Sequence, residues 1–188
     1  MSRGGGRVRI IAGRLRGSRI DLPDRPGLRP TPDRVRETLF NWLAPYVEGV
    51  RALDLFAGSG ALGIEALSRG AAEVEFVESE RTLVDALRAT LTRLKQSAVV
   101  HGLVASQFLQ SARAPYALLF LDPPFAENLW STTAERLEQG GFLADGAMVY
   151  VETPRDLHPV LPANWRLHRE LLAGEVRASL YRRAVPVG

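Results

Sequence analysis

The chain has 188 residues, of which 46% are hydrophobic, and a formal net charge of +3. It contains no cysteine and three scattered histidines, which excludes a disulfide framework and a thiolate metal site and argues against a histidine-only metal site. No apolar run resembles a signal peptide or approaches the length of a membrane span. We therefore expect one soluble, unprocessed cytoplasmic domain with a small appendage, without a metal and without membrane contact.

The charge is distributed unevenly along the chain. Residues 1–36 contain ten arginines and three aspartates, a net charge of +7, so the remaining residues carry a net charge of −4. A basic segment attached to a mildly acidic body is typical of a protein that contacts a polyanion with one end. The sequence therefore favours nucleic acid as a partner.

Two short alternating runs open the chain, at residues 7–11 and 18–22, and predict a β-hairpin with outward-facing arginines. Repeated prolines in residues 23–32 predict a stiff, extended linker. We expect residues 1–30 to form a basic hairpin arm with its linker, followed by the main domain over 31–188. A solvated hairpin without a binding role is the alternative. The arginines expected to contact nucleic acid are Arg7, Arg9, Arg14, Arg16, Arg29 and Arg34.

The first helix is expected to begin at Thr31-Pro32-Asp33, where the side chain of Thr31 or Asp33 can cap it. Val35, Leu39 and Leu43 then recur on one helical face. This spacing predicts a helix that packs on a sheet through that face.

The segment from Leu53 to Gly63 reads as an apolar strand over 51–56, a turn with glycines in the order G-x-G-x-x-G, and a helix over 61–69. Such glycines let the backbone turn tightly, approach a ligand closely and seat the helix against the sheet. The spacing serves nicotinamide cofactors and S-adenosylmethionine alike. Asp54 suits a methionine ammonium group or a bound water network and would repel a pyrophosphate, whereas Glu78 suits the ribose hydroxyls of either cofactor.

Strands and helices continue to alternate up to residue 151. The expected strands cover 73–78, 99–104, 116–121 and 147–151, and the expected helices cover 80–95 and 127–139. This alternation predicts an α/β fold with a mostly parallel sheet covered on both faces. Alternating runs at 165–171 and 176–182 predict an antiparallel C-terminal hairpin at one edge of the sheet.

A second motif, Asp122-Pro123-Pro124-Phe125, directly follows the strand expected over 116–121. It should lie at the carboxyl end of the sheet, where ligands bind in open α/β folds. The two prolines remove two N–H donors, so the corner offers only acceptors, the Asp122 carboxylate and the Pro123 carbonyl. Two acceptors can hold both hydrogens of an exocyclic base amine, and Phe125 offers a face on which the base can stack.

These motifs carry a resemblance to known proteins. The glycine segment together with residues 122–125 resembles the class I S-adenosylmethionine-dependent methyltransferases that modify exocyclic amines and have a Rossmann-like sheet. Residues 29–43, 9–13 and 174–181 narrow the resemblance to the bacterial RsmD family, over nearly the whole chain. It implies methyl transfer from S-adenosylmethionine to the exocyclic N2 of a guanine in 16S rRNA, within the small ribosomal subunit or an assembly intermediate.

The resemblance also implies which residues form the site. The target base would be held by the catalytic residues Asp122, Pro123, Pro124 and Phe125. The cofactor would be bound by Asp54, Phe56, Ala57, Gly58, Ser59, Gly60 and Glu78. One region departs from the family pattern: Leu103-Val104-Ala105 stands where many relatives have a polar residue, and Ser106 is the nearest polar side chain. The contact to the cofactor adenine is therefore left unassigned.

Three other functions compete with this interpretation. An N6-adenine methyltransferase acting on DNA or RNA would use the same acceptor corner, although a DNA enzyme would need an added recognition domain. A non-catalytic RNA-binding or ribosome assembly protein could keep a methyltransferase fold, but Asp54, Gly58, Gly60 and Asp122 are all present. A nicotinamide dehydrogenase would have no use for the Asp-Pro-Pro-Phe motif.

Overall fold

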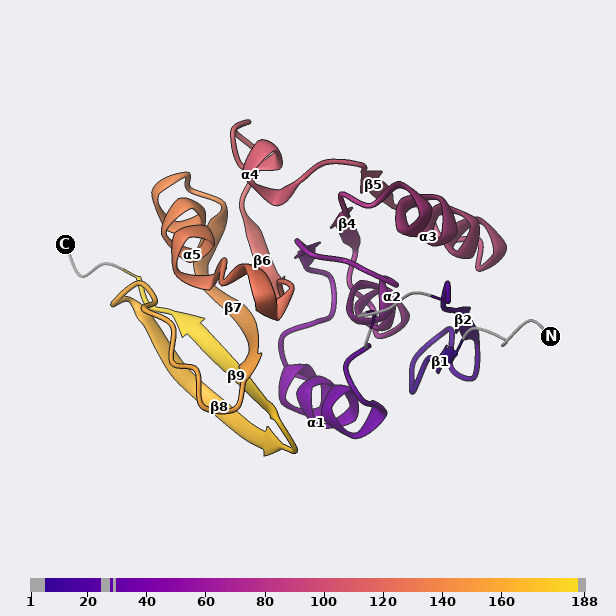
Figure 1. The fold of residues 1–188 in the computed structure, drawn as a ribbon, viewed down its shortest axis with the longest axis horizontal. Helices are drawn as coiled ribbons and strands as arrows, with labels where there is room; N and C mark the ends of the chain where they lie inside the picture. The colour runs from indigo at the N-terminus through magenta and orange to yellow at the C-terminus, as the bar shows by residue number, and fades with distance from the viewer. Residues whose placement is uncertain (1–5, 25–27, 29, 186–188) are drawn as a thin grey trace.

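The computed structural model describes residues 6–24, 28 and 30–185. A seven-stranded sheet with the strand order β5-β4-β3-β6-β7-β9-β8 forms its centre (Figure 1). Strands β3 to β7 are parallel, whereas β9 is antiparallel to β7 and β8 is antiparallel to β9. The strands are β3 (Arg51–Asp54), β4 (Glu73–Val77), β5 (Val99–His101), β6 (Tyr116–Leu121), β7 (Leu143–Pro154), β8 (Trp165–Ala173) and β9 (Val176–Arg183). The predicted parallel sheet and C-terminal hairpin are confirmed.

Helices cover both faces of this sheet and define two apolar cores. On one face lie α1 (Asp33–Leu43), α2 (Ala61–Ser68) and α3 (Arg81–Arg93), which share a core with Phe120 and Tyr150. On the other face lie α4 (Ala105–Phe108) and α5 (Trp130–Gln139), packed against Leu119 and Val149. Successive residues of a strand point to opposite faces, so an apolar strand such as β6 contributes to both cores.

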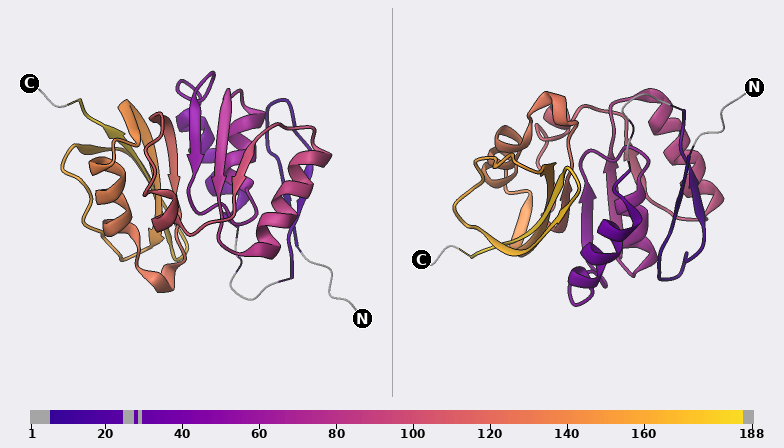
Figure 2. Two further views of the ribbon diagram at one scale, coloured as in Figure 1. Left: turned by 90° about the horizontal axis from the view of Figure 1, so that it is seen from above. Right: turned by 60° about the horizontal axis from the view of Figure 1, so that its bottom comes forward.

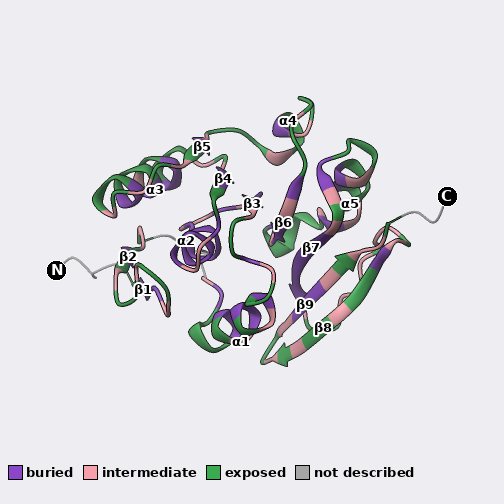
Figure 3. Ribbon diagram, turned by 180° about the vertical axis from the view of Figure 1, so that it is seen from behind, coloured by how far each residue is buried: buried purple, intermediate pink, exposed green. Residues whose placement is uncertain are grey.

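Exposure differs between the centre and the edge of the sheet. Figure 3 shows buried residues along β6 and β7 and mostly exposed or partly exposed residues along β8.

The N-terminal hairpin and the C-terminal hairpin lie at opposite ends of the molecule (Figure 2). Within the described ranges, no helix has the length and apolar composition needed to cross a membrane.

The structure confirms the N-terminal hairpin, which consists of β1 (Arg7–Arg9) and β2 (Arg19–Asp21). Three arginines and Asp21 occupy the exposed positions of its strands, and Val8 and Ile20 between them are buried in the core shared with α1 and α2. The turn between the strands packs closely on α2, because a Cβ on Gly13 would lie 2.0 Å from the carbonyl oxygen of Ser68. The hairpin is therefore docked on the body, and the boundary at residue 30 stays a prediction.

Helix α1 begins at Asp33, within the predicted start at residues 31–33, but without the predicted side-chain cap. The N-cap residue is Pro32, and no side chain caps the helix. The Thr31 hydroxyl instead donates a hydrogen bond to Glu152, at 2.8 Å, and the Asp33 carboxylate pairs with Arg36, at 2.6 Å. The predicted side-chain cap was wrong because these two polar groups have partners outside the cap position.

Several element boundaries also differ from the predicted ones. Strand β5 ends at His101 because the chain turns there into the short helix α4. A 3-10 turn over Phe125–Glu127 precedes α5, so the expected helix begins three residues late. Strand β7 is longer than the predicted 147–151, since it pairs with β6 on one side and β9 on the other.

Candidate active site

Three carboxylates lie at the carboxyl ends of neighbouring parallel strands. Asp54 is the last residue of β3, Asp122 directly follows β6, and Glu152 lies near the end of β7. The register pairs Asp54 with Phe120 and Leu121 with Val151, so Asp122 and Glu152 occupy adjacent positions. All three follow the alternation that places Phe120 in the core beside α1, and so share that face of the sheet.

The glycine loop that follows β3 requires its glycines for conformation and for space. Gly58 and Gly60 have positive φ values of 54° and 79°. A Cβ on Gly60 would lie 2.4 Å from Leu87 of α3, and one on Gly63 would lie 2.2 Å from the ring of Phe76. The glycines therefore let the loop and the first turn of α2 fit between β4 and α3, as the motif predicts.

Asp54 lies beneath this loop and is almost fully buried. Its carboxylate accepts a hydrogen bond from the backbone N–H of Gly63, at 3.0 Å. Burial raises the pKa of Asp54 to about 7, the Gly63 hydrogen bond opposes this, and the charge of Glu78 adds to it. A cationic group bound near Asp54 would favour its ionised form. The residue thus suits the ammonium group of a methionine.

Glu78 follows β4 and reaches back to the glycine loop. Its two carboxylate oxygens accept hydrogen bonds from the backbone N–H groups of Gly58 and Glu80, both at 2.8 Å. Each oxygen keeps a lone pair for another donor, such as a ribose hydroxyl. Among the described residues, a Cβ added to Gly58 would meet Leu28 alone, at 3.6 Å, an ordinary van der Waals distance that leaves room for a close ligand. These residues fit the cofactor that the sequence predicts.

The Asp-Pro-Pro-Phe corner combines an acid that has other acids nearby with a partly exposed aromatic ring. Burial raises the pKa of Asp122 well above its usual range, and the nearby charges of Glu152 and Asp54 raise it further. Phe125 is 40% exposed, and its ring centroid lies 5.8 Å from that of the buried Trp130. Trp130 therefore supports one side of a ring whose other side can receive a base.

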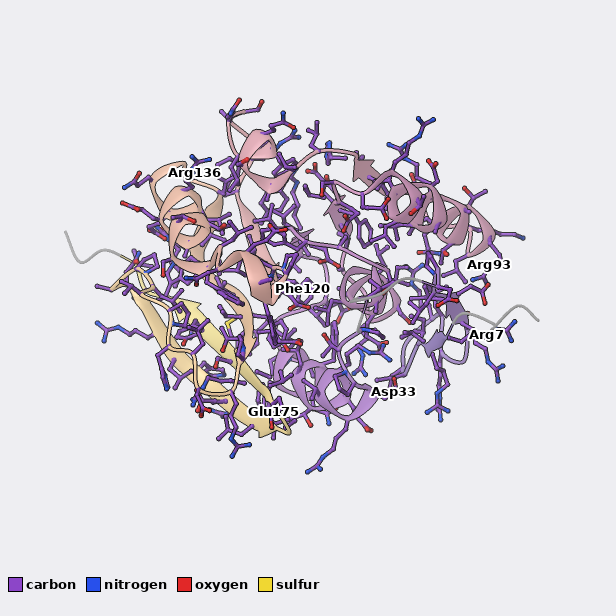
Figure 4. All side chains as sticks on the ribbon, in the orientation of Figure 1. Arg7, Asp33, Arg93, Phe120, Arg136 and Glu175 are labelled. Atoms are coloured by element: carbon purple, nitrogen blue, oxygen red, sulfur yellow. The ribbon has the colours of Figure 1, made fainter. Side chains whose placement is uncertain are left out.

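The predicted arginines do not gather around these carboxylates. Arg7 forms an ion pair with Asp21 on the hairpin, and Arg14 donates to the carbonyl of Leu67. Figure 4 shows Arg7 at the edge of the molecule and Phe120 near its centre. Arg9, Arg16 and Arg34 are exposed, and Arg29 lies outside the described residues. The described arginines lie on the hairpin and at the start of α1, away from the strand ends that carry the carboxylates.

Sequence reasoning missed Glu152. The available signal was an acid that directly follows the apolar strand predicted over 147–151, at the same end of the sheet as Asp122.

Within the ranges that the structure describes, no group of three or more acidic, histidine or cysteine side chains could hold a metal ion.

The sheet is parallel except for its antiparallel last hairpin, a glycine loop follows the central strand β3, and the Asp-Pro-Pro-Phe corner follows the neighbouring strand β6. This combination defines the class of protein: the class I S-adenosylmethionine-dependent methyltransferases. The particular family follows from the sequence. The chain belongs to the RsmD family, whose model, described as "Conserved hypothetical protein 95", matches residues 8–182.

Sequence identity and structural similarity to known proteins support this assignment. The chain is 50% identical over 182 residues to the "Ribosomal RNA small subunit methyltransferase D" of Escherichia coli (strain K12), covering 96% of this chain and 92% of that relative. The solved structure of yhhF from Escherichia coli, a candidate methyltransferase, has a TM-score of 0.89 at 46% identity, covering 96% of this chain and 99% of that chain. SMU.776, a candidate methyltransferase complexed with SAH, has a TM-score of 0.66 at 15% identity, with 88% and 54% covered, and shares the fold alone.

Replacement of Glu78 by alanine is expected to weaken the binding of S-adenosylhomocysteine about 10- to 100-fold, because hydrogen bonds to a charged group contribute about 1.5–3 kcal/mol. Isothermal titration with S-adenosylhomocysteine, S-adenosylmethionine and NAD measures this, and Glu135→Ala on the exposed face of α5 is the control. Binding of NAD at micromolar concentration without a response to either methionine compound would contradict the proposed cofactor site.

Proposed function

We propose that the protein transfers a methyl group from S-adenosylmethionine to the exocyclic N2 of a guanine in 16S rRNA, in the cytoplasm, with the small ribosomal subunit or an assembly intermediate as substrate. The observation that carries the proposal is the position of Asp122 beside the glycine loop, at the carboxyl ends of the adjacent strands β6 and β3. The names of the relatives support an RNA substrate in the small subunit.

Some residues of the site would bind the cofactor, and others would orient the target base. When bound, S-adenosylmethionine supplies an electrophilic methyl group on a sulfonium. Asp54, Gly58 and Glu78 would hold its methionine and ribose parts. The Asp122 carboxylate and the Pro123 carbonyl would accept the two N–H groups of the target amine, which directs the nitrogen lone pair toward the methyl carbon. Stacking on Phe125 would keep the unstacked base in this orientation.

The transfer should be direct. The chain has no cysteine that could form a covalent intermediate with the base. The nitrogen lone pair forms the new N–C bond as the C–S bond breaks, and the nitrogen then loses a proton. Asp122 would receive this proton, since burial and the neighbouring acids Glu152 and Asp54 raise its pKa and so make it a stronger base than an ordinary aspartate.

Nucleoside mass spectrometry tests the proposed function. Unmodified 16S rRNA and small subunits are incubated with the protein and S-adenosylmethionine and then digested to nucleosides. We expect N2-methylguanosine as the methylated product. N6-methyladenosine in its place would establish the adenine-specific alternative, and RNA binding without any methylated product would establish a non-catalytic RNA-binding protein.

The exposed arginines of the hairpin and of α1 are expected to supply affinity for RNA. Among the described residues, the side chains of Arg9, Arg16 and Arg34 have no hydrogen-bond or ion-pair partner. Replacing all three with glutamine should weaken RNA binding and reduce the slope of log K against log salt by about 2–3, because fewer counterions are released.

Filter-binding or fluorescence titrations at several salt concentrations measure that slope. Arg136→Gln is the matched control, since Arg136 projects from α5 on another part of the molecule (Figure 4). An unchanged slope in the triple variant would show that these arginines are solvated and do not contact RNA.

A further inference from the structure

Glu152 is a buried acid for which the proposed mechanism has so far no use. It is 5% exposed and lies on β7 beside Asp122, which directly follows the neighbouring strand β6. One of its carboxylate oxygens, Oε2, accepts a hydrogen bond from the Thr31 hydroxyl at 2.8 Å and another from the Tyr150 hydroxyl at 2.7 Å. Its position is therefore fixed from two sides, by the segment before α1 and by its own strand.

The backbone at Glu152 is also held by the residue that supports the base-stacking ring. The indole N–H of Trp130 donates to the carbonyl oxygen of Glu152, at 2.7 Å, and the Trp130 ring contacts Phe125. Glu152 is thus connected to both parts of the acceptor corner, to Asp122 by the strand register and to Phe125 through Trp130.

Among the described residues, the titratable groups that act on Asp122 are acidic or neutral. Asp54 faces it from β3, Glu152 and Tyr150 face it from β7, and Glu78 acts on Asp54 from the loop after β4. Burial raises the pKa of Glu152, and the hydrogen bonds from Tyr150 and Thr31 oppose this, so these two hydroxyls favour its ionised form. An ionised Glu152 disfavours a second negative charge on Asp122 and so increases the affinity of Asp122 for a proton.

We propose that Glu152 is a positioning residue for methyl transfer: held by Thr31 and Tyr150, its charge beside Asp122 makes Asp122 a stronger acceptor for the proton that the methylated amine releases. This inference rests on the proposed methyl transfer to an exocyclic amine. In that step the N–C bond forms as the C–S bond breaks, the electron pair of the broken bond stays on sulfur, and the proton passes from nitrogen to Asp122 and then to water.

The proposal predicts a shift in the pH dependence of the reaction. The rate of methyl transfer should fall at low pH, because Asp122 becomes protonated there and can no longer accept the proton. Since the charge of Glu152 raises the pKa of Asp122, Glu152→Gln should lower that pKa and move the acidic limb of the pH–rate profile to lower pH. The plateau rate should fall about 10-fold because Asp122 becomes a weaker base. Glu152→Asp, which keeps the charge, should restore the parent limb in large part.

Single-turnover methyl transfer to 16S rRNA, measured from pH 5 to 9 with saturating S-adenosylmethionine, tests this. Asp156→Asn is the matched control, because it removes one negative charge from an exposed position just after β7 and should leave both limb and plateau unchanged. If Glu152→Gln does not fold, Thr31→Val provides the second variant. Loss of this hydroxyl makes Glu152 easier to protonate, so the limb should move in the same direction by a smaller amount.

An acidic limb that stays in place, or that moves to higher pH, would overturn the role of Glu152 while leaving the proposed function intact. A parent protein that transfers no methyl group to RNA would overturn the proposed function itself, and the role of Glu152 with it. A loss of plateau rate without a shifted limb would show a purely structural role, which also contradicts the proposal.

Discussion

Asp122→Asn is expected to lower the single-turnover rate of methyl transfer by about 10²–10³, by analogy with the loss of one positioned hydrogen-bond partner of a reacting group. The amide can present N–H donors to the donor N–H groups of the target amine, and it cannot take up the released proton. Rapid-quench measurement with 16S rRNA or small subunits and saturating S-adenosylmethionine gives this rate. Asp122→Ala, which removes the acceptor altogether, should show a loss at least as large.

Two controls separate this effect from damage to the fold. Titration with S-adenosylhomocysteine should show unchanged affinity, because Asp122 follows β6 whereas the glycine loop follows β3. Thermal unfolding should show no loss of stability at neutral pH, since burial and two neighbouring acids disfavour the charge of Asp122 in the folded state. Transfer at close to the parent rate in both variants would refute the acceptor-corner mechanism.

Arg36→Met is expected to lower the free energy of unfolding by about 3–5 kcal/mol, the cost of removing one partner of a buried ion pair. The side chains of Arg36 and Glu65 are both fully buried, with 3.4 Å between Nη1 and Oε2. Arg36 also donates to the carbonyl of Arg9 on the hairpin, at 2.9 Å, and to that of Thr31, at 3.3 Å. One guanidinium thus connects the hairpin, the segment before α1 and helix α2.

Urea unfolding at neutral pH measures this loss. Arg34→Met, on the exposed face of the same helix, is the control and should change the free energy of unfolding by less than about 0.5 kcal/mol. A change below about 1 kcal/mol in Arg36→Met would show that the buried pair does not fix the hairpin to the body.

Because these contacts join the hairpin to the body, the RNA-binding role of the hairpin is better tested by substitution than by deletion. Glu65 accepts hydrogen bonds from the backbone N–H groups of Ile11 and Ala12, at 2.9 and 3.1 Å. Deleting residues 1–22 would leave this buried carboxylate with fewer donors and would remove the buried side chains of Val8 and Ile20 from the core that they share with α1 and α2. A truncation would therefore mix a loss of stability with a loss of charge, whereas replacement of the exposed arginines changes charge alone.

The order and type of most elements could be read from the sequence, because the signals are local. The glycine spacing after an apolar strand, the alternating runs of both hairpins and the apolar run before Asp122 each depend on neighbouring residues. The class of fold and the family follow from the same motifs and are confirmed. The roles of individual cofactor and base contacts stay predictions, supported by the positions of Asp54, Glu78 and Asp122.

Only the tertiary structure brought Glu152 beside Asp122. The two residues are far apart in the chain, and their proximity depends on the register between β6 and β7, which pairs Leu121 with Val151. Thr31 likewise reads as a helix cap in the sequence but donates to Glu152 across 121 residues. Local patterns determine which elements form, whereas strand register and core packing determine which side chains meet, since those contacts join segments that the sequence keeps apart.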